Sequence, residues 1–262
     1  MNDTALRILT YNIQVGISSS RSRDYITHGW KHLLPYPGRM RNLNAIGEFL
    51  EPFDLVGLQE LDAGSLRSAY INQAEYLALR GGFPYWASRT NRNLGHLARH
   101  SHGMLARMEP LAVIEHRLPS AIPGRGALEL LFGDEHNKLA VISAHLSLSR
   151  RGRQRQLDFL AELVGEHRHV VLLGDLNCGA DSPELRSLIA RSHLQPPVLM
   201  EPTYPSWKPV RDLDQILVSE NLRPGAALVH PVEFSDHLPV SLELHLPDEL
   251  AVALGKTPQK AS

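Results

Sequence analysis

Hydrophobic residues in this chain fall mainly into short runs bounded by turn residues, a pattern that predicts strands. Predicted strands cover residues 6–13, 54–60, 104–106, 113–118, 126–132, 139–146, 170–173, 212–218, 226–229 and 240–246. Helical spacing of apolar residues predicts helices over 39–50, 69–79 and 154–164, and Ser182-Pro183-Glu184 is typical of a helix start. Each half of the chain runs strand, helix, strand, helix and then several strands, which favours two packed sheets with outer helices in one domain.

Two polar segments interrupt this pattern. Residues 17–38 contain a serine- and arginine-rich run and two prolines, so we predict a long loop there. Residues 89–107 hold four arginines and three histidines but no acidic residue. That segment is either a solvated loop leading into the short strand 104–106 or an anion-facing surface, and the sequence leaves both interpretations open. After Pro247 we expect a peripheral tail.

The strongest strand signal ends in polar residues that could form a site. Four apolar residues, 170–173, precede Gly174, Asp175 and Asn177. Alternation along an extended chain puts Asp175 and Asn177 on the same side. Asp and Asn are also ordinary turn residues, so this stretch alone is ambiguous. However, oxygen or imidazole groups end several other predicted strands as well: Asn12, Glu60, His145, Asp214, Asp236 and His237.

This set of side chains predicts a particular kind of chemistry. Carboxylate and amide oxygens are the ligands that a hard cation such as Mg²⁺ prefers, with waters and substrate phosphate completing the octahedron. Zinc would require clustered His or Cys ligands, which the sequence lacks. Histidines beside carboxylates add the capacity to transfer protons or to neutralise phosphate. The sequence therefore indicates a Mg²⁺ (or Mn²⁺) site with acid–base groups beside it.

Composition narrows the class of protein. The chain has 262 residues, 43% of them hydrophobic, and a formal net charge of −1, so it carries no strong global basic field for nucleic acid. Its single cysteine, Cys178, cannot form an internal disulfide and fits a reducing compartment. We see no signal peptide and no apolar run of about eighteen residues, so we expect a cytoplasmic protein without stable membrane insertion or an obligate protein partner.

Six short motifs in order resemble those of the endonuclease/exonuclease/phosphatase (DNase I-like) superfamily. They are Leu9-Thr10-Tyr11-Asn12-Ile13, Leu58-Gln59-Glu60, Ser143-Ala144-His145-Leu146, Leu173-Gly174-Asp175-Leu176-Asn177, Leu213-Asp214-Gln215-Ile216-Leu217-Val218-Ser219 and Ser235-Asp236-His237-Leu238-Pro239-Val240. The resemblance covers residues 6–246, so we assign residues 1–247 to this domain and 248–262 to a C-terminal tail. It implies a four-layer α/β sandwich in which two facing, mostly antiparallel sheets lie between outer helices.

The resemblance also implies site roles, residue by residue. Metal ligands would be Glu60, Asp236 and Asn12. Catalytic groups would be Asp175, which orients or deprotonates the attacking water, Asn177 and His145, which contact the phosphoryl group, and His237 with its partner acid Asp214. Two positions depart from the pattern: Gln215 would be histidine in many bacterial relatives, and His102 stands where many members have asparagine.

These observations predict a metal-dependent phosphoesterase that acts on a phosphodiester or phosphomonoester, with nucleic acid as one candidate substrate. Candidate substrate-binding residues are Arg92, Arg99, His102 and Arg125. A phospholipid or inositol-phosphate phosphatase, or a sphingomyelinase-like phosphodiesterase, is the alternative within the same chemistry. An inactive binding module on the same fold is the alternative of another class. A calcineurin-like metallophosphatase is disfavoured because its early Asp-x-His and later Gly-Asn-His motifs are missing.

Overall fold

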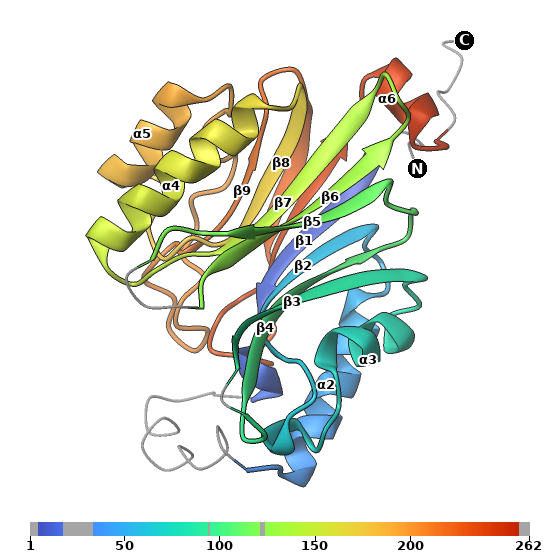
Figure 1. Ribbon diagram of the computed structural model, residues 1–262, viewed down its shortest axis with the longest axis vertical. Helices are drawn as coiled ribbons and strands as arrows, with labels where there is room; N and C mark the ends of the chain where they lie inside the picture. The colour runs from blue at the N-terminus through green and yellow to red at the C-terminus, as the bar shows by residue number, and fades with distance from the viewer. Residues whose placement is uncertain (1–4, 18–33, 94, 121–123, 257–262) are drawn as a thin grey trace.

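Two β-sheets pack face to face in the computed structural model, which describes residues 5–17, 34–93, 95–120 and 124–256 (Figure 1). The six-stranded sheet has the order β10-β11-β1-β2-β4-β3 and the five-stranded sheet the order β5-β6-β7-β8-β9. The first consists of β1 (Ala5–Asn12), β2 (Leu55–Asp62), β3 (Tyr85–Asn93), β4 (Arg99–Ala106), β10 (Arg223–Val229) and β11 (Val240–His245). The second consists of β5 (Ala112–Arg117), β6 (Gly126–Gly133), β7 (Lys138–His145), β8 (His169–Asp175) and β9 (Asp214–Val218).

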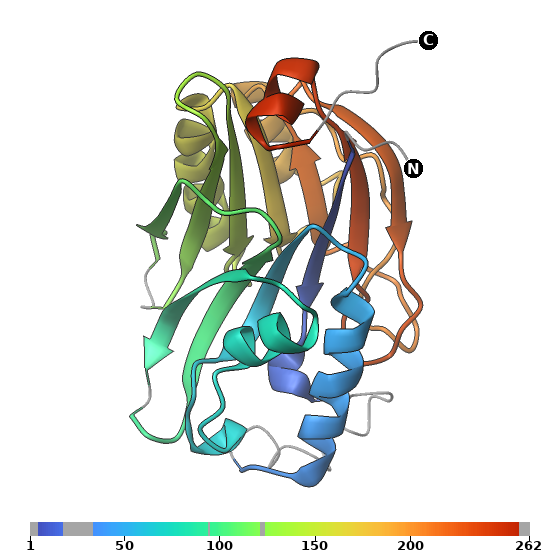
Figure 2. The same cartoon turned by 90° about the vertical axis from the view of Figure 1, so that its right-hand side faces the viewer.

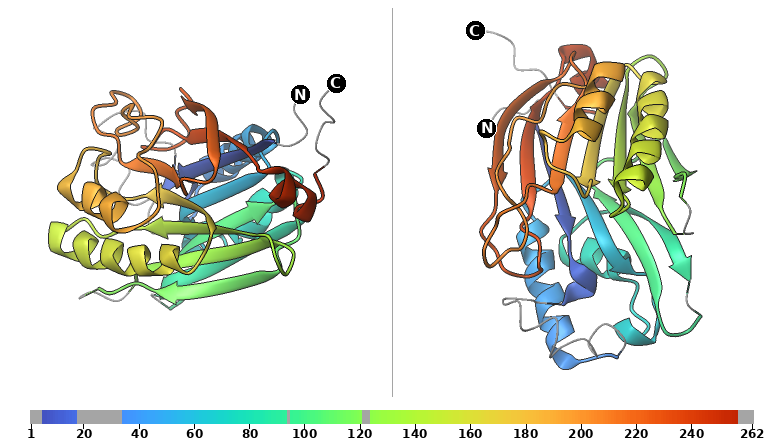
Figure 3. Two further views of the ribbon diagram at one scale, coloured as in Figure 1. Left: turned by 90° about the horizontal axis from the view of Figure 1, so that it is seen from above. Right: turned by 90° about the vertical axis from the view of Figure 1, so that its left-hand side faces the viewer.

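The helices form the outer layers. They are α2 (Pro37–Leu50), α3 (Gln73–Arg80), α4 (Arg150–Gly165), α5 (Pro183–Arg191) and α6 (Asp248–Ala253), with short 3₁₀ turns η1 (Gln14–Gly16) and η3 (Leu66–Ser68). Helices α2 and α3 cover the six-stranded sheet (Figure 2), and α4 and α5 cover the five-stranded sheet (Figure 3). This arrangement confirms the predicted four-layer sandwich.

Alternation of side chains explains why each sheet can be covered on both faces. In β8, Val171 and Leu173 belong to the core between the sheets, whereas Val170 and Leu172 pack under α4 and α5. Successive residues of a strand point to opposite faces, so a strand buried on both sides reads as a continuous apolar run. The hydrophobic run that the sequence analysis singled out is therefore a central strand.

The topology brings the polar strand ends to one edge of the sandwich. Strands β1 and β2 are parallel, as are β7 and β8, so the carboxyl ends within each pair lie together. Strand β9 runs antiparallel to β8, so its first residue, Asp214, lies opposite Asp175. Strand β11 runs antiparallel to β1, so the loop that carries Asp236 and His237 reaches the end of β1. Residues from six separate motifs thus meet.

The predicted strands and helices are confirmed in most places, with corrections at the β3–β4 hairpin and at the start of α3. Residues 89–107, read as a loop before a short strand, contain most of the β3–β4 hairpin, whose β3 is a largely exposed edge strand without apolar alternation. Helix α3 begins at Gln73 rather than at residue 69, because Asn72 caps it: the Asn72 side chain accepts a hydrogen bond from Ala74 N. Of the long loop predicted at 17–38, residues 18–33 lie outside the described residues.

The segment after Pro247 is not a simple peripheral tail. Residues 248–253 form α6, and its Leu250 and Ala251 are fully buried in the core between the sheets. The last six residues, 257–262, lie outside the described part of the chain. Among the described helices, none is long and apolar enough to cross a membrane.

Candidate active site

Asp175 is the residue around which the site is built, at the carboxyl end of β8. The preceding Gly174 has φ +143°, and a Cβ on it would lie 1.8 Å from the carbonyl oxygen of Ala144. Only glycine tolerates both the conformation and the contact, so it allows β8 to approach β7 closely just before the carboxylate. Asn177, two residues later, has φ +54°, which asparagine adopts more readily than most residues.

Short contacts hold the Asp175 carboxylate in a fixed orientation. Asn12 Nδ2 donates to Asp175 Oδ2 over 3.0 Å, a bond between residues of the two sheets. The backbone N–H of Asn177 donates to Asp175 Oδ1 over 3.0 Å, and the Asn177 side chain is held by the carbonyl oxygen of Leu146 at 2.9 Å. His145 Nε2 lies 3.5 Å from Asp175 Oδ2. Each carboxylate oxygen therefore has one protein donor and further capacity to accept.

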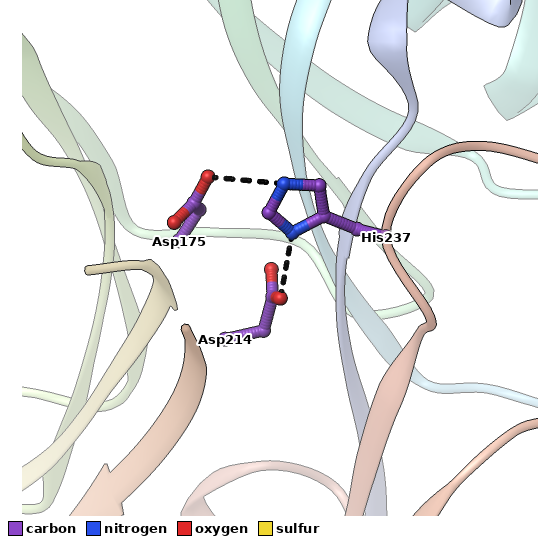
Figure 4. A group of neighbouring side chains, drawn as sticks. All are labelled: Asp175, Asp214 and His237. Atoms are coloured by element: carbon purple, nitrogen blue, oxygen red, sulfur yellow. Dashed lines mark hydrogen bonds and ion pairs between the residues drawn. The ribbon is translucent and has the colours of Figure 1, made fainter. Parts of the chain in front are cut away.

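His237 lies between two carboxylates, as Figure 4 shows. Its Nδ1 is 2.8 Å from Asp214 Oδ2, and its Nε2 is 3.7 Å from Asp175 Oδ2. Thr203 Oγ1 donates to the same Asp214 oxygen over 2.6 Å. The Tyr204 ring lies with its centroid 4.8 Å from that of His237. Asp214 thus fixes the ring so that Nε2 points toward Asp175.

Glu60 and Asp236 are the other acids at this end of the sandwich. Glu60 has φ +54°, and the register of β2 against β4 shifts between Leu58 and Leu61. A left-handed backbone is unfavourable for glutamate, and such strain concentrates at functional sites. Ser235 Oγ donates to the carbonyl oxygen of Asn12 over 2.7 Å and is 3.1 Å from Asp236 Oδ1. The Ser235 hydroxyl therefore ties the last motif to the end of β1.

The electrostatics of the site follow from burial and from crowded charges. Burial raises the pKa of Asp175 to about 7, although His237 opposes this effect, and Asp214 adds to it. Burial also raises the pKa of Glu60, with the nearby Asp236 carboxylate as the next cause. The pKa of His237 is raised well above its usual value, since attraction to Asp214 and Asp175 outweighs its burial. Four buried or half-buried acids thus share the site with few cations.

Two sets of side chains could hold a metal ion. Asp175, Asp214 and His237 offer three ligand atoms that lie within 4.8 Å of one another. The second set is the predicted one, Glu60, Asp236 and Asn12. In the first set, Asp214 and His237 already satisfy each other through a direct hydrogen bond. The second set keeps carboxylate and amide oxygens together, which is the chemistry that a hard cation prefers.

A cleft of about 570 Å³ opens beside these residues, and Glu60 and His145 are part of its wall. Arg125 also lines it, and its Nη1 donates to the carbonyl oxygen of His145 over 3.3 Å. Arg92 lines the cleft as well. Two of the four predicted substrate-binding residues therefore reach the cleft from separate elements.

The other two predicted substrate-binding residues do not form part of the cleft wall. Arg99 is half-buried, and its backbone N–H donates to Asp62 Oδ2 over 3.2 Å. His102 is fully buried, with Nδ1 2.7 Å from Asn91 Nδ2, and burial lowers its pKa to about 3. The structure thus places the His102 side chain inside the protein and outside the wall of the cleft. Sequence periodicity could not reveal this, since the edge hairpin was read as a loop.

Sequence reasoning missed several supporting groups. Thr203 lies outside the six motifs that resemble the family, and Ser235 begins the last of them but was given no role there. Their hydroxyls hold Asp214 and the end of β1, so they orient groups that contact the chemistry rather than perform it. A hydroxyl next to an acid, as at Ser235, is too common a pattern to single out, and Thr203 is eleven residues from Asp214 in the sequence.

Comparison with known proteins agrees with this geometry. The family model described as Endonuclease/Exonuclease/phosphatase family matches residues 9–237. No protein among the curated sequences matches significantly. A solved endonuclease/exonuclease/phosphatase structure from Beutenbergia cavernae is 22% identical, with a TM-score of 0.73 over 92% of this chain and 72% of that one.

Two further solved structures share the fold at lower identity. A mannosyl-6-phosphatase from Bacteroides thetaiotaomicron is 14% identical, with a TM-score of 0.69 over 92% of this chain and 100% of that one. A humanised TDP2 from D. rerio is 16% identical, with a TM-score of 0.65 over 93% of this chain and 100% of that one. The family match spans most of the sequence, and it begins at the strand that carries Asn12 and ends at His237. The chain therefore belongs to the endonuclease/exonuclease/phosphatase family.

Proposed function

We propose that this protein is a metal-dependent phosphoesterase that hydrolyses a phosphodiester or phosphomonoester by in-line attack of an activated water. The observation that carries the proposal is the convergence on Asp175. Asn12 comes from the other sheet, His145 from the neighbouring strand, and His237 from the last motif, each within 3.7 Å of the same carboxylate oxygen. Such a buried set of acids and imidazoles is typical of a catalytic site.

Glu60 and Asp236, with Asn12, would hold the metal ion, which we propose to be Mg²⁺ or Mn²⁺. The fit rests on the chemistry of these donors: burial and then the Asp236 carboxylate raise the pKa of Glu60, so a cation between the two acids would relieve their repulsion. When bound, such an ion supplies a Lewis acid that polarises the phosphoryl oxygen and offsets developing negative charge. Asn12 also donates to Asp175, so it couples the metal-binding side of the site to the water-binding side.

Asp175 would position the attacking water. Its two oxygens are fixed by Asn12 Nδ2 and the N–H of Asn177, which leaves lone pairs that can accept a water hydrogen in a defined direction. A carboxylate anchored in this way orders the nucleophile before reaction and can take its proton.

The histidines would contact the phosphoryl group. Asp214 accepts from His237 Nδ1, so His237 Nε2 is available to donate a hydrogen bond to a phosphoryl oxygen. His145 Nε2 lies on the same side of Asp175 Oδ2, at 3.5 Å. Asn177 would support the phosphate from the turn after β8. Donors aimed at an oxygen that gains charge stabilise the transition state more than the ground state.

The type of ester bond and the class of substrate are also part of the proposal. The panel that separates them is abasic duplex DNA, single-stranded DNA, RNA, phosphoinositides, sphingomyelin and bis(4-nitrophenyl) phosphate, each with Mg²⁺. An inactive binding module is disfavoured, since the site keeps its acids together with His145 and His237.

The direct test is hydrolysis of bis(4-nitrophenyl) phosphate by the full chain with Mg²⁺ or Mn²⁺, before and after exhaustive chelation. We expect activity with metal, none after chelation, and recovery on adding metal back. His237→Asn should lose the activity, whereas Asp158→Asn, at an exposed ion pair with Arg191, should keep it. Full activity after chelation, or an active His237→Asn, would contradict the proposal.

A further inference from the structure

The cleft beside the catalytic residues is lined by an unusual set of cations. Four arginines reach it: Arg92 from β3, Arg125 from the loop before β6, and Arg151 and Arg155 from the first turns of α4. Among the described residues that line the cleft, Glu60 is the single carboxylate. In the described part of the chain, no carboxylate forms an ion pair with Arg92, Arg151 or Arg155.

The arginines at the start of α4 divide into two groups by the face of the helix on which they lie. Arg153 Nη2 lies 3.0 Å from Glu184 Oε1 on α5, and Arg150 Nε lies 3.7 Å from Glu184 Oε2. Arg151 and Arg155 are four residues apart, so they lie on one face, and both line the cleft. The helix thus uses one pair to bind α5 and presents the other pair to the cleft.

The backbone of α4 adds to the same field. Ser149 caps the helix, and its hydroxyl accepts from Gly152 N over 3.3 Å. Ser149 and Gly152 both belong to the wall of the cleft. The amino end of a helix carries a partial positive charge, so this wall favours an anion. A guanidinium group can donate two parallel hydrogen bonds to two oxygens of a phosphate, which gives the anion a defined orientation.

The position of Arg125 shows how the cleft relates to the reaction. Its Nη1 donates to the carbonyl oxygen of His145. Arg125 therefore lies beside His145, at the catalytic end of the cleft that Arg92, Arg151 and Arg155 also line. A scissile phosphoryl group at Glu60 and His145 would leave most of the 570 Å³ unfilled, since that volume is in the range that holds a whole small ligand.

From this arrangement we infer a subsite for a second phosphate: Arg92, Arg151 and Arg155 bind a phosphate group of the substrate that is not hydrolysed, while Arg125 bridges to the scissile one. The inference rests on the proposed function and specifies its substrate class, which is a phosphate ester with at least one further phosphate on the same molecule. A nucleotide chain and a multiply phosphorylated sugar both offer this chemistry.

The test compares matched esters that differ only in the remote phosphate. The first pair is the 4-nitrophenyl ester of thymidine 5′-phosphate, with and without a 3′-phosphate. The second pair is glucose 1,6-bisphosphate and glucose 6-phosphate. With Mg²⁺ at low salt, we expect the second phosphate to raise kcat/KM by roughly tenfold or more in at least one pair, mainly through KM, as one charge-assisted hydrogen bond would. The pair with the larger ratio identifies the source of the substrate.

The matched variants are R151Q/R155Q and, as control, R150Q, which changes an arginine of the same turn that faces α5. The double variant should bring the ratio between the two esters close to one, and raising the salt concentration should reduce the wild-type ratio. R150Q should keep the wild-type ratio. A wild-type ratio near one for both pairs, or an unchanged ratio in R151Q/R155Q, would overturn the subsite.

A binding measurement separates failure of the subsite from failure of the proposed function. If the wild-type protein hydrolyses none of the four esters, the proposed activity is wrong for this substrate class. Calorimetry in chelator then still tests the subsite, with thymidine 3′,5′-bisphosphate and thymidine 5′-phosphate as probes. Tighter binding of the bisphosphate by roughly tenfold, lost in R151Q/R155Q, supports the subsite. Equal binding of the two probes overturns it.

Discussion

Asp62 and Asp175 are both aspartates at the carboxyl end of a buried strand, yet their surroundings differ completely. Asp62 accepts hydrogen bonds from five donors: Ser65 N at 2.6 Å, Ser65 Oγ at 2.7 Å, Arg67 Nε at 2.5 Å, Ser68 Oγ at 2.8 Å and Arg99 N at 3.2 Å. Asp175 accepts two, at 3.0 Å each. One carboxylate is saturated by the protein and the other is not.

The pKa values of the two groups reflect this difference. Burial alone would raise the pKa of Asp62, but the bonds from Arg67, Ser65 and Ser68 outweigh it, so the pKa is lowered. Burial raises the pKa of Asp175 to about 7 despite the attraction of His237. An acid saturated with donors stabilises a fold, whereas an acid left with spare lone pairs beside imidazoles can act on a substrate.

Asp175→Asn should produce the largest effect on activity. The amide keeps the shape of the side chain but cannot accept a proton from water, so the turnover number should fall by roughly 10²–10⁴-fold. Extra Mg²⁺ should not restore it, and the free energy of unfolding should not fall by more than about 1 kcal/mol, since a buried charge is removed. Activity against Mg²⁺ concentration and urea unfolding measure both. Rescue of the turnover number by metal would mean that Asp175 is a metal ligand instead.

Asp62→Asn should show the opposite pattern. Removing one partner leaves the Arg67 guanidinium, whose side chain is only 2% exposed, without its anion. Breaking a buried pair in this way typically costs about 3–5 kcal/mol of unfolding free energy. Urea unfolding measures this loss, while turnover per folded molecule should stay close to wild type. If the variant is as stable as wild type but has lost turnover, Asp62 acts in catalysis and does not differ from Asp175 in the way described above.

A matched exposed pair sets the scale for this measurement. Asp158 contacts Arg191, but the side chains are 38% and 50% exposed. Exposed pairs contribute only about 0–1 kcal/mol, because solvent screens the charges. Asp158→Asn should therefore leave the unfolding transition nearly unchanged. A loss as large as that of Asp62→Asn would mean that burial is not what distinguishes the two pairs.

The sequence analysis named Asp175 as a candidate catalytic residue and gave no role to Asp62, and the structure brings the strand-end residues together at one edge. Polar residues at strand ends could be placed at one edge, because hydrophobic runs fix the strands and topology aligns their ends. An apolar strand that ends in an aspartate does not by itself separate Asp175 from Asp62; the resemblance of the motif around Asp175 to the family assigned a role to that residue alone. Four of the five donors to Asp62 come from residues three to six positions later, whereas Asn12, which binds Asp175, is 163 residues away.

The errors have a related physical cause. Strand β3 is an edge strand with an exposed, arginine-containing sequence, so it lacks the apolar alternation that identifies central strands. Helix α6 has six residues, too few to show a helical period, yet Leu250 closes one end of the core. Both elements are stabilised by what they pack against rather than by their own sequence.

Glu60→Gln sharpens the comparison with a third carboxylate. If Glu60 is a metal ligand, the Glu60→Gln substitution should raise the Mg²⁺ concentration needed for half activity by roughly 10–100-fold, which is the effect of substituting a group that supports a metal ligand. The rate should recover at high Mg²⁺. Glu129→Gln is the matched control, because Glu129 is also buried but binds His116 and His167 away from the site. If Glu60→Gln reaches half activity at an unchanged Mg²⁺ concentration, the metal is bound by Asp175, Asp214 and His237 instead.

The smallest expected effect is the pH dependence of stability that Asp62 contributes. Its pKa in the folded protein is lowered, whereas in the unfolded chain an aspartate has a pKa of about 3.9. Such a group contributes stability that is fully present above the unfolded pKa and is lost as the pH falls through the folded pKa. The difference in unfolding free energy between wild type and Asp62→Asn should therefore be constant from about pH 5 to 8 and shrink below about pH 4. Urea titrations at each pH, with chelator present, measure this difference.

Asp158→Asn, measured in parallel, corrects for the general effect of acid on the fold. A difference that grows on acidification would mean that Asp62 is protonated more readily in the folded protein than in the unfolded chain. The five hydrogen bonds around Asp62 would then not be favouring its charged form, and the contrast with Asp175 would not hold.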